Sequence, residues 1–163
     1  MAADTLAGPA EAVAAALKSA QQTVAVAESS TGGLISARLL AVPGASAYYL
    51  GGSVIYTMEA RGQLLAMSRT ELKRYEPLTD EYVSRCARAI QTRLDATWGL
   101  AELGATGPAG TPYGHPPGIC VLAVTGPVNL TKRIETGPGD REANMQRFCN
   151  EAFALFNQAL GGA

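Results

Sequence analysis

The sequence predicts an α/β protein with a three-layer α/β/α sandwich on a mixed, mostly parallel sheet. Its 163 residues, 47% of them hydrophobic, are enough for one domain with a sizeable core. Apolar runs of strand length alternate with stretches of helical periodicity along the chain. One short turn, 125–127, joins two predicted strands as a hairpin, which makes the sheet mixed. The chain has no internal repeat or linker, so residues 1–163 are predicted to form a single domain.

The first predicted elements alternate between helix and strand. Small and branched apolar residues recur at helical spacing over 9–20, and the initial proline is tolerated in a first turn. The apolar run 24–27 predicts a buried strand, and 34–40 predicts the helix that follows it. Residues 47–56 are rich in β-branched and aromatic side chains around two adjacent glycines. This pattern predicts a second strand with a bulge at the glycines.

Three helices, three strands and a final helix are predicted in the rest of the chain, over 59–65, 69–75, 80–94, 98–105, 118–124, 129–135 and 140–160. Thr79 stands before two acidic residues, a pattern typical of the start of a helix. A loop rich in glycine and proline separates the first two of these strands. The hairpin turn then pairs the third strand with the second, and the last helix is long and amphipathic.

Composition argues against several classes of function. Thirteen basic residues against 14 acidic ones give a net charge of -1, so we expect neither nucleic acid nor a membrane as partner, and a small neutral or anionic metabolite fits better. Cys86, Cys120 and Cys149 are widely spaced and predict buried, reduced thiols with no metal or disulfide role. No apolar run has the length of a membrane span, and the start lacks a signal-peptide pattern. We expect a soluble, cytoplasmic protein.

The turn 27–33, Ala-Glu-Ser-Ser-Thr-Gly-Gly, is the most informative segment, because it joins a predicted strand to a predicted helix. Thr31 or Ser30 can cap that helix. Gly32 and Gly33 let a ligand approach backbone N–H groups at the positive end of the helix dipole. Such a turn suits an anion or a developing oxyanion. Similar turns also occur in α/β proteins that bind nothing there, so this segment alone leaves both interpretations open.

Four motifs follow one another in a fixed order, over 27–33, 43–47, 51–56 with 59–60, and 104–110 with 117–118. In this order and spacing they resemble the CinA carboxy-terminal domain family, and the resemblance runs from about the first helix to the last. The best-known members are nicotinamide-nucleotide amidases. The resemblance therefore implies hydrolysis of nicotinamide mononucleotide to nicotinic acid mononucleotide and ammonia, with no cofactor and no metal. Nothing resembles the separate amino-terminal domain of some members, so we expect a stand-alone version.

Amide hydrolysis without a metal needs an activated nucleophile, donors for the oxyanion and an acid for departing ammonia. Ser29 matches the family's nucleophilic serine, and its alternative role is a turn serine bonded to the backbone. Backbone N–H groups near Thr31, Gly32 and Gly33 are expected to serve an oxyanion or a phosphate. Tyr56 matches an active-site tyrosine of the family. It is expected to orient the nucleophile or to stack near the pyridine ring, and ordinary packing is the alternative.

Arg61 is the main departure from the family. Active members read Asn-Glu-Ala-Lys where this chain reads Met-Glu-Ala-Arg over 58–61. A lysine can lose its proton and act as general base toward serine, whereas arginine stays charged because its pKa lies above about 12. The guanidinium can still bind phosphate or stabilise an oxyanion. Two hypotheses stay open: an amidohydrolase with Ser29 as nucleophile, and a catalytically silent member that binds a pyridine or related nucleotide. A third hypothesis is a purely structural module for dimerisation.

The predicted site is completed by the segment 104–110, at the end of the predicted strand 98–105, and by the start of the last helix. In the family this loop lines the nucleotide pocket, and a tight turn imposed by its prolines is the alternative. Arg141 matches a family arginine near the substrate phosphate, and a salt bridge with Asp140 or Glu142 is its alternative. Ser30 replaces a cysteine common in the family. The predicted substrate-binding set is Glu28, Ser30, Thr31, Gly32, Gly33, Gly104, Ala105, Thr106, Gly107 and Arg141. The apolar last helix and the hairpin predict a homodimer.

Overall fold

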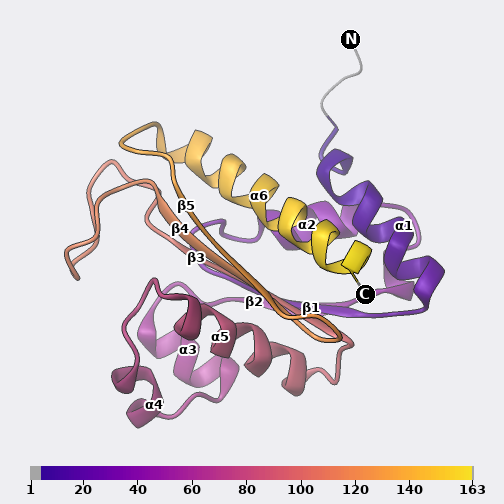
Figure 1. The fold of residues 1–163 in the computed structure, drawn as a ribbon, viewed down its shortest axis with the longest axis horizontal. Coiled ribbons are helices and arrows are strands. Elements are labelled where there is room, and N and C mark those ends of the chain that lie inside the picture. Colours follow the sequence, from indigo (N-terminus) through magenta and orange to yellow (C-terminus); the bar gives the residue numbers. More distant parts are fainter. Residues whose placement is uncertain (1–4, 163) are drawn as a thin grey trace.

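A computed structural model describes residues 5–162 and shows three layers, with helices on both faces of a central sheet (Figure 1). The sheet has five strands in the order β2-β1-β3-β4-β5. Their bounds are β1 Val24–Glu28, β2 Tyr49–Val54, β3 Trp98–Gly104, β4 Ile119–Thr125 and β5 Leu130–Glu135. Strand β1 pairs in parallel with β2 and β3, whereas β4 is antiparallel to both β3 and β5. The predicted α/β/α sandwich on a mixed sheet is confirmed, and parallel pairing is confined to β2, β1 and β3.

Three helices cover each face of the sheet (Figure 1). One layer contains α1 Glu11–Ala20, α2 Leu34–Ala41 and α6 Arg141–Gly162, and the other contains α3 Met58–Leu65, α4 Arg69–Arg74 and α5 Asp80–Arg93. Two short 3-10 turns, Gly8–Ala10 and Ala45–Ala47, precede α1 and β2. Each helical layer shares its own apolar core with one face of the sheet. The predicted strands and helices are present, with ends that shift by at most a few residues.

Strand alternation decides which face each side chain of the central strands meets. In β1, Val26 packs in the core under α1, α2 and α6, and Ala27 packs in the core under α5. Because successive side chains point to opposite faces, Glu28 lies on the same face as Val26. In β3, Glu102 lies on the same face as Leu100 for the same reason. Two acidic side chains are therefore directed into the interior beneath α2 and α6.

The edge strand β2 contains the bulge that its glycines predict. Val24 pairs with Tyr49, and the next residue of β1, Ala25, pairs with Gly51. Leu50 is left without a partner in β1, and a bulge of one residue is the result. Leu50 is 44% exposed, so this edge of the sheet presents an apolar side chain to solvent.

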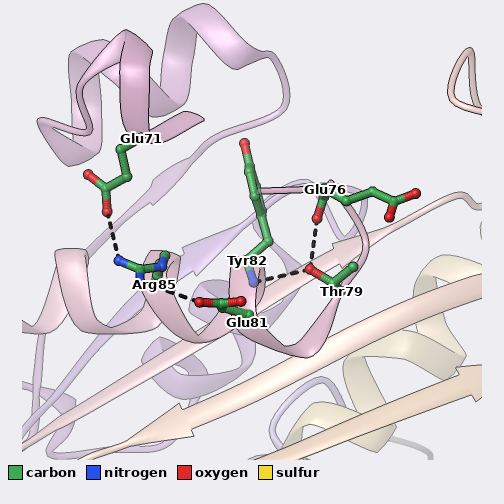
Figure 2. Close-up of polar contacts among 6 residues, drawn as sticks. All are labelled: Glu71, Glu76, Thr79, Glu81, Tyr82 and Arg85. Carbon is green, nitrogen blue, oxygen red and sulfur yellow. Dashed lines mark hydrogen bonds and ion pairs between the residues drawn. The ribbon is translucent and has the colours of Figure 1, made fainter. Parts of the chain in front are cut away.

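The start of α5 agrees with the prediction made from Thr79. Its hydroxyl accepts a hydrogen bond from Tyr82 N at 3.3 Å and donates to a backbone carbonyl in the preceding turn at 2.7 Å (Figure 2). Arg85, one turn further along, pairs with Glu71 of α4 and with Glu81, each at 3.4 Å. Exposed pairs of this kind contribute about 0–1 kcal/mol. The pair with Glu71 joins α4 to α5, whereas the pair with Glu81 lies within α5, the helix from which the buried Tyr82 side chain enters the interior.

The three cysteines are buried, as predicted. Burial raises the pKa of both Cys86 and Cys149 to about 12, so these thiols stay protonated at neutral pH. Burial also raises the pKa of Cys120 well above its ordinary value. None of the helices within 5–162 is both long and apolar enough to cross a membrane.

Candidate active site

The predicted site segments meet at one end of the sheet, beyond the carboxyl ends of β1, β2 and β3. Strand β1 leads into α2 on one face, whereas β2 leads into α3 on the opposite face. A crevice opens where neighbouring parallel strands send their connections to opposite faces, and ligands of α/β proteins usually bind in such a crevice. The β3–β4 loop and the start of α6 lie at the same end (Figure 1).

Two adjoining hollows occupy this end of the molecule. The first, called the Ser29 hollow, has a volume of about 340 Å³ and is lined by Ser29, Arg61 and several apolar side chains. The second, called the Arg141 hollow, has a volume of about 320 Å³ and is lined by Ser30, Arg141 and the β3–β4 loop. The residues that line both hollows are Tyr56, Gly104, Thr111 and Pro112. The β1–α2 turn therefore presents one serine to each hollow.

The start of α2 differs from the prediction. The N-cap is Gly33, with a φ of 107°, and neither Thr31 nor Ser30 caps the helix. The carboxylate of Glu28 takes this role, because it accepts hydrogen bonds from Gly33 N at 2.8 Å and Ser36 N at 3.0 Å. A buried carboxylate at the positive end of the helix dipole is a stronger acceptor than a hydroxyl. The amides at the first turn of α2 therefore already donate to a carboxylate of the protein itself.

Most other amides of the turn also have internal acceptors. Gly32 N donates to Ser29 O at 3.1 Å, and Thr31 N donates to the Glu102 carboxylate at 3.0 Å. Ser29 N donates to the carbonyl and to the carboxylate of Glu102, both at 3.0 Å. Within the described residues, Ser30 N makes no hydrogen bond. Ser30 N is therefore the amide of this turn that is left for an external acceptor.

Glu102, which the sequence analysis did not select, lies at the centre of the turn and is fully buried. Its Oε2 accepts hydrogen bonds from Ser29 N, Thr31 N and Thr31 Oγ1, and its Oε1 accepts one from Ser30 Oγ. Burial raises the pKa of Glu102, and hydrogen bonds from Ser30, Thr31 and Ser29 offset part of that rise. The missed signal was a single acidic residue within an otherwise apolar strand.

Ser29 and Tyr56 both line the Ser29 hollow, but their environments differ. Ser29 is 5% exposed, and in the described part of the chain its Oγ makes no hydrogen bond. Tyr56 is 57% exposed, and its hydroxyl accepts a hydrogen bond from Arg141 at 3.4 Å. Ser29 therefore has a free hydroxyl in the hollow, and Tyr56 links the two hollows at their rim.

Arg61 is buried, and its guanidinium is occupied by structural contacts. Its Nε donates to Ile55 O at 3.2 Å, and its Nη2 donates to Tyr56 O at 3.4 Å. Its Nη1 donates to Tyr82 Oη at 3.2 Å, and the guanidinium carbon lies 5.5 Å from the centre of the Tyr82 ring. Arg61 thus ties α3 to α5 and to the segment after β2. No hydrogen bond joins it to Ser29 within residues 5–162.

Arg141 spans the mouth of the Arg141 hollow. Its Nη1 donates to Gly107 O at 2.6 Å, and its Nη2 donates to the Tyr56 hydroxyl at 3.4 Å. None of the ion pairs within the described chain joins it to Asp140 or Glu142, the alternative partners. Asp140 accepts a hydrogen bond from the backbone of α6. The guanidinium is held at the loop by neutral oxygens, which leaves its charge uncompensated.

Asn144, a buried residue of α6 that the sequence analysis also missed, holds the β3–β4 loop through hydrogen bonds. Its Nδ2 donates to Thr106 O at 2.9 Å, and its Oδ1 accepts from Thr136 Oγ1 at 2.7 Å. Among the loop residues that line the Arg141 hollow, four have amides that make no hydrogen bond within the described chain, namely Thr106, Gly107, Ala109 and Gly110. Unused N–H groups beside an arginine are a typical arrangement for binding an anion.

Sequence comparison gives one family and a set of relatives. The model of the family described as the CinA C-terminal domain matches residues 7–160. A CinA-like protein from Thermosynechococcus vestitus is 39% identical over 124 residues, which cover 76% of this chain and 29% of that protein. A CinA-like protein from Parasynechococcus marenigrum is 40% identical over 115 residues, which cover 71% and 27%. The chain spans about a third or less of the length of these curated relatives.

Solved structures with the same fold cover almost the whole chain. The crystal structure of a competence-damaged protein (CinA) superfamily protein from Escherichia coli has a TM-score of 0.88 at 28% identity and covers 97% of this chain and 92% of that chain. A protein of the same superfamily from Klebsiella pneumoniae has a TM-score of 0.90 at 27% identity, with coverage of 98% and 100%. The similarity therefore includes both helical layers and the sheet.

Proposed function

The chain belongs to the CinA C-terminal domain family, and from this premise we propose that it hydrolyses the amide of a nicotinamide ribonucleotide. The proposed reaction converts nicotinamide mononucleotide and water to nicotinic acid mononucleotide and ammonia, and it uses no cofactor. The observation that carries the proposal is the convergence of serine hydroxyls, free loop amides and an uncompensated arginine on two adjoining hollows. An amidohydrolase for an anionic substrate needs these three kinds of group.

The two hollows fit the two ends of such a nucleotide. The Arg141 hollow offers a guanidinium and unpaired amides, which suit a phosphate monoester. The Ser29 hollow is lined by apolar side chains such as Met58, Leu78 and Leu103, which suit a pyridine ring. Because the β1–α2 turn lines both hollows, a carboxamide that faces the turn meets a serine hydroxyl.

The chemical step needs a hydroxyl of this turn as nucleophile. The family resemblance assigns the role to Ser29, whose Oγ is free and lines a hollow. Arg61 cannot act as its base, because a guanidinium keeps its proton at any physiological pH. In this proposal Arg61 holds the wall of the Ser29 hollow, and the Tyr56 hydroxyl orients the substrate. Ser30 N supplies a donor for the oxyanion.

A second candidate function is nucleotide binding without turnover. The occupation of Arg61 by Ile55, Tyr56 and Tyr82 favours it, because a lysine base would need a free amine near Ser29. In that case the wild-type protein binds nicotinamide mononucleotide but releases no ammonia, and Arg61→Lys restores release. The amidohydrolase proposal expects release by the wild type itself.

Ammonia release from nicotinamide mononucleotide, followed with a coupled glutamate dehydrogenase assay, tests the proposed function. We expect release by the wild type and its loss in the double variant Ser29→Ala/Ser30→Ala, which removes both hydroxyls of the turn. Ser19→Ala, on the exposed surface of α1, is the matched control and keeps the wild-type rate. Titration calorimetry with the same nucleotide gives binding independently. A protein that neither binds nor hydrolyses the nucleotide contradicts both candidate functions.

A further inference from the structure

We propose that Tyr113 makes the Ser29 hollow selective for the oxidised, positively charged pyridine ring of the nucleotide, by placing the face of its own ring against it. Tyr56 supplies a second aromatic wall of the same hollow. The inference rests on the proposed function, and it names the chemical form of the substrate that this site prefers. It concerns binding of the ring and leaves the role of nucleophile with Ser29.

Tyr113 and Tyr56 are the exposed aromatic side chains of residues 5–162, at 53% and 57% exposure. Tyr56 follows β2, whereas Tyr113 belongs to the β3–β4 loop, and yet both line the Ser29 hollow. A single exposed apolar side chain needs no explanation. Two exposed aromatic rings that reach one hollow from segments far apart in the sequence indicate a site for a flat ring.

A closed turn of the β3–β4 loop carries Tyr113. Thr111 N donates to His115 O at 2.9 Å, and His115 N donates to Thr111 Oγ1 at 3.1 Å. Gly114 N donates to Thr111 O at 3.2 Å. The two arms of the turn pass so closely that a Cβ at Gly110 would lie 2.3 Å from His115 O. The backbone around Tyr113 is therefore ordered before a ligand arrives, which lowers the entropic cost of a contact with its ring.

The Tyr113 side chain has no structural role that explains its place. Within the described chain it belongs to neither apolar core, and its hydroxyl makes no hydrogen bond. Its phenol lies near that of Tyr82: burial is the main cause of the raised pKa of Tyr82, Arg61 offsets part of the rise, and the Tyr113 phenol adds to it. Tyr113 therefore faces the wall of the Ser29 hollow that Arg61 and Tyr82 form.

The charge of the substrate ring explains why aromatic faces are needed. In oxidised nicotinamide mononucleotide the ring nitrogen is bonded to ribose and carries a positive charge, whereas the dihydropyridine ring of the reduced form is neutral and not aromatic. Among the described residues that line the Ser29 hollow, Arg61 is charged and no carboxylate is present. The face of a phenol ring attracts a cation that lies within about 6 Å of its centre. Tyr113 and Tyr56 are thus the groups that can stabilise a cationic ring beside Arg61.

Tyr113 acts at the ring end of the nucleotide and not at its phosphate end. Tyr56, Thr111 and Pro112 line both hollows, but Tyr113 lines only the Ser29 hollow. Ser29 lines that hollow as well, so a ring held against Tyr113 has its carboxamide on the side of the β1–α2 turn. Substitution of Tyr113 is therefore expected to change selectivity for the ring and to leave the contact between phosphate and Arg141 intact.

Titration calorimetry with nicotinamide mononucleotide and with its reduced form tests the inference. The two ligands share ribose, phosphate and carboxamide, and they differ in the charge and aromaticity of the ring. The titrations use Ser29→Ala, so that hydrolysis by the proposed nucleophile does not consume the ligand. We expect the oxidised form to bind about 3- to 30-fold more tightly, the range that cation–π contacts supply. Equal affinities, or tighter binding of the reduced form, overturn the inference.

Two substitutions of Tyr113 in the same background assign the preference to its ring. Tyr113→Leu keeps an apolar side chain but removes the aromatic face, and we expect it to reduce the preference for the oxidised form by about threefold or more. Tyr113→Phe is the matched control, because it keeps the face and removes only the hydroxyl, and its preference should stay within about twofold of the reference. Thermal unfolding verifies that both variants are folded. A preference that Tyr113→Leu retains, or that Tyr113→Phe loses, overturns the inference.

Ammonia release by the wild type distinguishes failure of the inference from failure of the proposed function. If the wild type releases ammonia from nicotinamide mononucleotide but the two forms bind equally, the proposed function stands and the role of Tyr113 is wrong. If the oxidised form is preferred through Tyr113 but no ammonia is released, the inference stands and the protein binds the nucleotide without turnover. If neither form binds, both the inference and the proposed function fail.

Discussion

Glu28 and Glu102 are direct partners across the parallel pair of β1 and β3, and both side chains are fully buried. Thr31 Oγ1 lies 2.8 Å from Glu28 Oε1 and 2.8 Å from Glu102 Oε2. A hydroxyl has one proton, so Thr31 can donate to only one of the two carboxylates at a time. The two carboxylates therefore share this donor. Burial raises the pKa of Glu102, and its hydrogen bonds from Ser30, Thr31 and Ser29 offset part of that rise.

The stability of the protein is expected to depend on pH through Glu102. Its pKa is raised in the folded state, so the folded protein binds this proton more tightly than the unfolded chain. The stabilisation is complete below the unfolded pKa of about 4.3 and is lost as the pH rises through the folded pKa. The other titratable groups that face Glu102 are Glu28 on β1, Cys120 on β4 and Cys149 on α6.

Urea unfolding at a series of pH values tests this dependence. We expect the free energy of unfolding of the wild type to fall as the pH rises from about 4.3 through the folded pKa of Glu102. In Glu102→Gln the free energy of unfolding should fall less over the same pH range. Glu11→Gln, which alters an exposed carboxylate, follows the wild-type curve. Identical pH slopes for the wild type and Glu102→Gln contradict the assigned pKa direction.

Arg61→Lys is expected to destabilise the fold by about 1–3 kcal/mol. One ammonium cannot reach Ile55 O, Tyr56 O and Tyr82 Oη in the directions that the guanidinium serves, so buried acceptors lose their donor. Arg93→Lys, at the exposed end of α5, is the control and should change stability by less than about 0.5 kcal/mol. Equal unfolding midpoints for the two variants contradict the structural role of Arg61.

Arg141→Met is expected to weaken binding of nicotinamide mononucleotide by about tenfold or more, because a charge-assisted contact to phosphate is lost. Nicotinamide riboside lacks the phosphate, so its affinity should be almost the same for the variant and the wild type. Arg147→Met, also on α6 and exposed, is the matched control. Calorimetry with both ligands measures the effect. Equal losses for the two ligands contradict a phosphate contact.

The homodimer remains a prediction, but the surface expected to form it moves from the last helix to the edge strand β2. The apolar side chains of α6, including Phe148 and Phe156, pack on the chain's own sheet. The edge strand β2 instead exposes Leu50 at 44%. We expect sedimentation to give twice the mass of one chain and Leu50→Glu to shift it toward the monomer. Leu64→Glu, equally exposed at 44% on α3, is the control. A monomeric wild type contradicts the prediction.

The fold was predictable because its signals are local. Apolar periodicity and turn residues identify the strands and helices, and the Thr79 cap depends on residues three positions away. The cap of α2 was predicted wrongly because Glu28, five positions before Gly33, reaches its amide and excludes the nearer hydroxyls. A charged acceptor at a helix start outweighs a neutral one. Sequence spacing alone does not reveal whether the carboxylate or one of the nearer hydroxyls caps the helix.

The candidate site was predictable only in outline. The turn, the loop and Arg141 were selected by their motifs, and they line two hollows that meet at Gly104. Glu102 was missed because its partners lie more than seventy positions earlier in the chain and meet it only through the pairing of β1 with β3. The structural role of Arg61 was missed for a similar reason, since Tyr82 reaches it from another helix.

Proton NMR of nicotinamide mononucleotide during incubation with the purified wild-type protein tests the proposed reaction most directly. The account predicts that the pyridine resonances of the substrate are replaced by those of nicotinic acid mononucleotide, with one ammonia for each product molecule. Unchanged resonances over many hours, at a protein concentration that calorimetry shows to bind the nucleotide, would contradict the proposed hydrolysis.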